Sequence, residues 1–122
     1  MLRGKILATV MALGLFVLGT GTAQAWDEIA DKRGRGRVTL RAWTRNYNQV
    51  GFTANHAGTR VEVTIEIDCR NGYHFEDTWG DGGGGFSFVR GGLGDNGRCN
   101  HTFKLVANQS SARLWLVIWA RG

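Results

Sequence analysis

The stretch RVEVTIEIDC, residues 60–69, decides the fold class, because apolar and polar residues alternate along it without interruption. Positions 61, 63, 65, 67 and 69 hold Val, Val, Ile, Ile and Cys, and the positions between them hold charged residues or Thr. Successive side chains of a β-strand point to opposite faces, so this pattern predicts a half-buried strand with Cys69 on its inner face.

Similar segments lie on both sides of this one, separated by short stretches in which Gly and Asn mark turns. Strands are expected at residues 37–45, 49–53, 60–69, 85–89, 98–107 and 112–121, and residues 73–79 fit either a strand or an ordered loop. No segment has a helical period. About seven strands at this regular spacing predict an all-β fold, a small antiparallel β-sandwich or barrel that forms a single domain over residues 37–122.

The start of the chain has the features of an export signal. A basic beginning precedes an apolar run at residues 6–18, and the sequence Ala23-Gln24-Ala25 matches the cleavage pattern of signal peptidase. The apolar run is shorter than the roughly 20 residues that a membrane span needs. We therefore predict a cleaved signal peptide over residues 1–25, bacterial-type export to the periplasm or the medium, and no transmembrane segment in the mature chain.

Residues 26–36 are polar and contain several glycines, so a flexible N-terminal segment is expected before the domain. The glycine-rich stretches around residues 85–89 are expected to be loops, with GDGGGG as the most mobile one.

The two cysteines, Cys69 and Cys99, both lie in the exported part. An even pair in an exported chain of this size predicts a disulfide, which would add about 3 to 4 kcal/mol of stability in the chain-entropy model. No C-x-x-C motif is present, and no cofactor is expected.

The chain is mildly basic, with 15 Lys and Arg against 10 Asp and Glu. Loss of Arg3 and Lys5 with the signal peptide leaves 13 against 10, a net charge of +3. This charge is compatible with anionic envelope polymers or lipid head groups, and export argues against nucleic acid as a partner.

A stripe of arginines lies on one face of the expected strand at 37–45, where Arg37, Arg41 and Arg45 flank Trp43. Two interpretations are open. The stripe is either a surface for an anionic polymer or the partner of the carboxylates on the strand at 60–69, in ordinary cross-strand pairs.

The last strand is apolar on one face, and its other face carries Arg113, Trp115, Val117, Trp119 and Arg121. Exposed indoles stack on sugars and, with arginine, are common in protein contact sites. Trp115, Trp119, Arg113 and Arg121, with Trp43 as a further member, are therefore the candidate binding residues. The alternative is that the loop at 70–84 folds over this face and buries it.

Two other functions remain open. A small secreted hydrolase would use His74 with Glu76 or Asp77 as an acid/base pair. A calcium-stabilised structural domain would take its ligands from Glu76, Asp77, Asp81 and Asp95, although no EF-hand spacing is present.

The preferred hypothesis is a non-enzymatic exported binding module for a protein partner, as in inhibitors or adhesins, or for an envelope glycan. The general plan, a signal peptide before a disulfide-linked β-domain, is similar to that of periplasmic inhibitors and of adhesion or carbohydrate-binding modules. This similarity is architectural and assigns no residue a role.

Overall fold

The computed structural model describes residues 25–93 and 97–122, and this part of the chain is all-β. Its strands are β1 (Asp27–Arg35), β2 (Arg37–Arg45), β3 (Gln49–Asn55), β4 (Val61–Cys69), β5 (His74–Asp81), β6 (Gly85–Arg90), β7 (Arg98–Ala107) and β8 (Arg113–Arg121). Apart from Ala25, the expected signal peptide lies outside the described residues. No helix in the described ranges has the length and hydropathy to cross a membrane.

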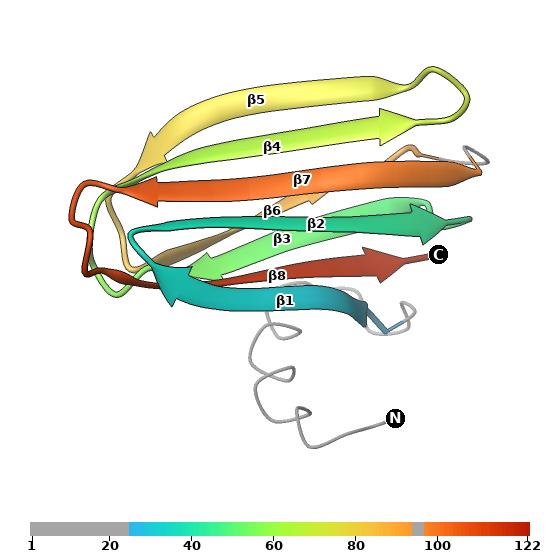
Figure 1. The fold of residues 1–122 in the computed structure, drawn as a ribbon. Helices are drawn as coiled ribbons and strands as arrows, with labels where there is room; N and C mark the ends of the chain where they lie inside the picture. Colours follow the sequence, from blue (N-terminus) through green and yellow to red (C-terminus); the bar gives the residue numbers. More distant parts are fainter. Residues whose placement is uncertain (1–24, 94–96) are drawn as a thin grey trace.

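The strands form two four-stranded antiparallel sheets, which lie over each other as two layers (Figure 1). Sheet A has the order β1-β8-β3-β6, and sheet B has the order β2-β7-β4-β5. This arrangement confirms the predicted all-β antiparallel fold and, of the two expected forms, it is a sandwich and not a barrel. β1 and β2 lie at one edge of their sheets, and β5 and β6 lie at the other edge.

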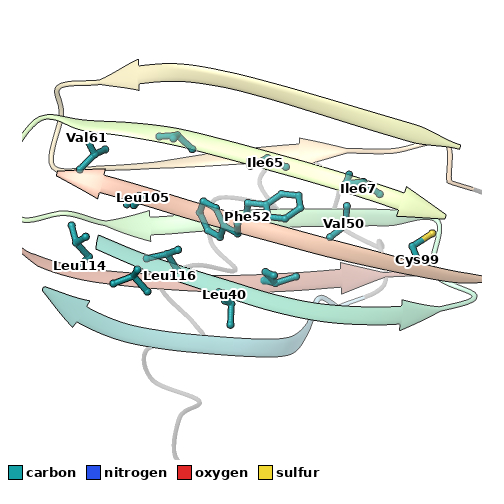
Figure 2. Close-up of a cluster of buried hydrophobic side chains, with 14 of the residues drawn as sticks. Leu40, Val50, Phe52, Val61, Ile65, Ile67, Cys99, Leu105, Leu114 and Leu116 are labelled. Carbon is teal, nitrogen blue, oxygen red and sulfur yellow. The ribbon is translucent and has the colours of Figure 1, made fainter. Parts of the chain in front are cut away.

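The core lies between the two layers. It consists of alternate residues of the strands, whose side chains point inward. In Figure 2 the side chains of Ile65, Phe52 and Leu116 point into this space from β4, β3 and β8. The ring of Phe52 packs edge-on against Phe103, with 5.3 Å between ring centroids. Burial of this apolar surface, at roughly 25 cal/mol per Å², is the main contribution to stability.

The predicted disulfide is confirmed. Cys69, the last residue of β4, lies directly opposite Cys99 on β7, and the two are bonded. The bond is at one end of the core, as Figure 2 shows for Cys99. It joins adjacent strands of sheet B and closes a loop with a sequence separation of 30.

The prediction of a flexible segment at residues 26–36 is wrong, because residues 27–35 form β1 and pair with β8. β1 is an edge strand, and charged residues are common on such strands because they discourage pairing with other chains. Lys32 reaches from β1 to the neighbouring edge of sheet B, where its Nζ donates a hydrogen bond to the carbonyl oxygen of Thr39 at 3.2 Å.

Two glycines allow the chain to cross from sheet A to sheet B at this edge. Gly36 has φ +73°, and a Cβ there would lie 2.7 Å from the carbonyl oxygen of Ser110. A Cβ at Gly34 would lie 2.7 Å from Cγ2 of Val38. These glycines therefore reflect a tight, ordered turn and not a flexible lead-in.

The segment at 70–84 does not cover the outer face of β8. Residues 74–81 form β5, which belongs to sheet B, and its aromatic side chains close the other edge of the sandwich. Phe75 stacks on Phe88 of β6 at 5.8 Å between centroids, and Trp79 lies 5.4 Å from the same ring.

Candidate functional site on the outer faces of the sheets

Trp119 of β8 is buried, with 1% of its surface exposed, so it is not available as a binding platform. Its partner in the register is Gly51 of β3, which leaves room for the indole to lie over the sheet. The indole Nε1 donates to Oγ1 of Thr53 at 2.8 Å. Trp26, just before β1, packs against Trp119 and Val117.

Arg121 is also engaged within the domain. Its Nε donates to Oε1 of Gln49 at 2.8 Å, and its guanidinium lies 4.7 Å from the ring centre of Trp26. Trp119 and Arg121, the candidate residues at this end of β8, are therefore used in contacts within the domain.

Trp115 and Arg113, at the other end of β8, are more accessible. The indole Nε1 of Trp115 donates to Oδ2 of Asp31 at 3.1 Å, and the guanidinium of Arg33 lies 4.0 Å over the ring. Both partners come from β1, which was expected to be flexible. Next to this group lies a surface cavity of about 510 Å³, whose lining includes Arg33, Arg35, Arg113, Asn55 and Trp115.

The cross-strand ion pairs expected for the arginine stripe do not form, because β2 pairs with β7 and not with β4. Arg41 lies opposite Thr102, and Arg45 lies opposite Arg98. β7 thus separates the arginines of β2 from the carboxylates of β4, and the charges of this outer face divide into a basic half and an acidic half.

Trp43 is the most exposed of the large apolar side chains in the described part of the chain, with 52% of its surface accessible. The guanidinium of Arg98 lies 4.5 Å from its ring centre. A cation stacked on an indole is worth about 0.5 to 1 kcal/mol at an exposed site. This contact holds the indole of Trp43 in place on the outer face of sheet B.

A row of polar residues continues from Trp43 across sheet B. Trp43 lies opposite Asn100, Asn100 lies opposite Asp68, and Asp68 lies opposite His74. Because neighbouring strands are about 4.8 Å apart, Asp68 lies about 10 Å from Trp43 across the sheet. In Figure 1 these strands, β2, β7, β4 and β5, form one continuous layer.

A second surface cavity, of about 470 Å³, lies along this row near the disulfide. Its lining residues are Asp68, Cys69, Arg70, Arg98 and Asn100. Arg98 therefore connects the indole of Trp43 to the cavity. The group combines a flat apolar surface with carboxylate, amide and guanidinium groups, which can together bind the apolar face and the hydroxyl groups of a ligand.

Of the three residues of the hydrolase hypothesis, His74 and Glu76 lie close together and Asp77 lies apart from them. His74 and Glu76 share the outer face of β5, with 3.7 Å between Nε2 and Oε1, and both side chains are about half exposed. Asp77 has the opposite strand parity, and its Oδ1 accepts the backbone N–H of Thr78 at 2.9 Å. An acid/base pair of His74 with Asp77 is thus not formed.

The residues of the calcium hypothesis do not form one site. Oδ2 of Asp81 lies 2.7 Å from Nε2 of the buried His56, and Asp95 lies outside the described residues. Within the described ranges, the group with metal-ligating atoms close together is Glu66, His74 and Glu76. It includes an imidazole, whereas calcium prefers oxygen ligands.

The other two histidines are buried. The Nδ1 of His56 lies against the carbonyl oxygen of Thr59, which only accepts hydrogen bonds, and Nε2 faces Asp81. His101 of β7 lies in the core, where burial lowers its pKa from 6.5 to about 4. Its Nε2 is 2.9 Å from Oγ1 of Thr44. The contact of His56 with Asp81 could not be predicted from the sequence, since 25 residues separate them.

Comparisons with known proteins relate this chain to others by fold. No protein-family model and no curated protein matches it. Among solved structures, it is similar to TmCBM61, determined in complex with β-1,4-galactotriose, with 10% identity, a TM-score of 0.50 and coverage of 80% of this chain and 68% of the other. At this identity the likeness shows a shared fold.

Two further solved structures resemble the chain at lower TM-scores. The C-terminal domain of A223, a structural protein of sulfolobus turreted icosahedral virus, has 7% identity, a TM-score of 0.48 and coverage of 80% of this chain and 99% of that domain. AlgX of Pseudomonas aeruginosa has 14% identity and a TM-score of 0.49, with coverage of 79% and 27%.

Proposed function

We propose that this protein is an exported, non-enzymatic glycan-binding module that holds an oligosaccharide on the outer face of sheet B, across Trp43. The observation that carries the proposal is the exposed indole of Trp43 at the end of a polar cross-strand row. Trp119 does not compete for this role, since its indole is buried and bonded to Thr53.

The proposed stacking surface is supported by the chemistry of the indole. One side of a pyranose ring exposes C–H groups, and the flat face of an indole packs against them while the ring hydroxyls remain accessible to polar groups. Because the guanidinium of Arg98 lies over one face of the indole, the sugar would stack on the other face. The contact with Arg98 lowers the conformational freedom that the Trp43 side chain would lose on binding, which favours affinity.

The proposed polar contacts come from the cavity beside Trp43. The carboxylate of Asp68 accepts hydrogen bonds, the guanidinium groups of Arg70 and Arg98 donate them, and the amide of Asn100 does both. Sugar hydroxyls also donate and accept, so they fit this mixed set. Because Asp68 and Trp43 are about two strand spacings apart, an oligosaccharide would engage both more effectively than a single sugar.

Three further features agree with the proposal. The fold is shared with a module solved with a bound galactotriose, the domain contains a disulfide, and the N-terminal sequence has the pattern of a signal peptide. The similar fold favours glycan binding only by analogy, and the residues around Trp43 provide the chemical argument.

The experiment compares the wild-type protein with Trp43→Ala in native gels that contain β-1,4-galactan, xylan or β-glucan. Calorimetric titration then measures the affinity for β-1,4-galactotriose or for fragments of whichever polymer retards the protein. Val89→Ala is the matched control, because Val89 is the other exposed large apolar side chain in the described residues, at 41%, and belongs to sheet A.

We expect wild type and Val89→Ala to be retarded by at least one polymer, and Trp43→Ala to bind it about tenfold or more weakly, as for an aromatic residue at the centre of a binding site. The fold should survive, since Trp43 is half exposed and its loss removes a contact with Arg98 worth about 0.5 to 1 kcal/mol. A wild-type protein that no polymer retards would reject glycan binding, and unchanged binding by Trp43→Ala would reject the site.

A further inference from the structure

We infer that the cavity at the start of β8 is a binding site for an oxyanion group, held by Arg33, Arg35 and Arg113. This site lies on the outer face of sheet A, whereas Trp43 lies on sheet B, so the inference does not depend on the proposed function.

The register of β1 and β8 places like charges together. Arg35 lies directly opposite Arg113, and Arg33 lies opposite Trp115, one pair further along the same face. Like charges directly opposite each other in a sheet reduce stability, typically by a few tenths of a kcal/mol to about 1 kcal/mol. Two adjacent strands therefore present three cations at one place, at a cost in stability.

None of the ion pairs seen within the described ranges involves Arg33, Arg35 or Arg113. Asp31 is the nearest acidic residue on the same face of β1, but it accepts the indole N–H of Trp115 and does not line the cavity. A ligand that brings negative charge would remove the repulsion between the arginines.

The side chain of Trp115 forms one wall of the site and is held in a fixed orientation. Its Nε1 is held by Asp31, and the guanidinium of Arg33 stacks 4.0 Å over its ring. A stacked guanidinium still has its in-plane N–H groups free to donate hydrogen bonds. Arg33 is therefore oriented by the indole while its donors remain available to a ligand.

The cavity offers room and a further polar group. Its volume is about 510 Å³, and it extends to Asn55 at the end of β3. Asn55 pairs with Trp115 in the register, and its Oδ1 accepts the backbone N–H of Ala57 at 3.0 Å, which leaves the amide NH₂ to donate. Guanidinium groups bind carboxylate, sulfate and phosphate through paired hydrogen bonds, so all three oxyanions fit this donor set.

The source of the oxyanion is distinguished by three probes in calorimetric titrations at low salt. Sodium sulfate and sodium phosphate represent the free ions, and an oligogalacturonate represents a carboxylate carried by a sugar chain. Arg113→Gln is the test variant. Arg60→Gln is its matched control, because it removes one exposed arginine whose guanidinium lies beside Gly80 of β5, at the opposite edge of the sandwich from β1.

We expect wild type and Arg60→Gln to bind at least one probe equally, within about twofold, and Arg113→Gln to bind it about tenfold or more weakly. The affinity should fall as salt rises. Without ligand, Arg113→Gln should melt at the wild-type temperature or slightly above it, because it relieves repulsion with Arg35.

Two results would overturn the inference. Equal losses in Arg113→Gln and Arg60→Gln would show that only net charge matters, and a wild-type protein that binds none of the three probes would show that the cavity is not an oxyanion site. Neither result bears on binding of neutral galactotriose at Trp43, so the two proposals fail separately.

Discussion

Acidification is expected to destabilise the domain through His101. This side chain is buried between the sheets, and burial lowers its pKa from 6.5 to about 4. The unfolded chain therefore binds a proton at His101 at a pH where the folded chain does not. Stability from this group is fully present above pH 6.5 and is lost as the pH falls from 6.5 to about 4.

The size of the effect follows from the shift. At 1.36 kcal/mol per pH unit, the contribution lost between pH 7 and pH 4 is about 3 kcal/mol. This is a large part of the 5 to 15 kcal/mol that is typical of a domain. The assay is urea unfolding of the oxidised protein at a series of pH values, followed by circular dichroism.

The variant His101→Leu removes the titrating group and keeps an apolar side chain in the core. Its free energy of unfolding at pH 7 is expected to fall, because Thr44 loses its partner, but the further loss between pH 7 and pH 4 should be about 3 kcal/mol smaller than in wild type. All other groups are the same in both proteins, so their contributions cancel in this difference. Parallel pH profiles would refute the assignment.

Two other predictions concern stability. Replacing Cys69 and Cys99 by Ala should lower the free energy of unfolding by about 3 to 4 kcal/mol, because the bond closes a loop with a sequence separation of 30. Chemical denaturation measures this loss, and a value below about 1 kcal/mol would contradict the entropic account. Trp119→Ala should cost about 3 to 5 kcal/mol, because it empties a buried site and leaves Thr53 without its partner, whereas Trp43→Ala should cost little. Similar thermal shifts for these two variants would contradict the difference in burial.

The fold class could be predicted from the sequence because alternation reports local structure directly. The expected strands at 37–45 and 98–107 agree with β2 and β7 at both ends. β1 was missed for a physical reason. Its inner face holds Lys32 and Gly34, which an edge strand tolerates, and a register shift between Glu28 and Ala30 interrupts its alternation.

The candidate site could be predicted only in part, because binding depends on which strands become neighbours. The sequence identified Trp43 as a possible contact, but Asn100 and Asp68 lie beside it only through the β2-β7-β4 order. The burial of Trp119 could not be predicted from the sequence either, since it depends on the pairing of β8 with Gly51 of β3 and on the packing of Trp26.

The most direct test of the central proposal is an NMR titration of the indole N–H signals. The chain has five tryptophans, and Trp43→Phe and Trp119→Phe assign the two signals that matter. On addition of the best-binding oligosaccharide, we predict that the Trp43 signal shifts progressively to saturation while the buried Trp119 signal does not move. A titration in which the Trp43 signal stays in place while binding is saturated would contradict the proposed site.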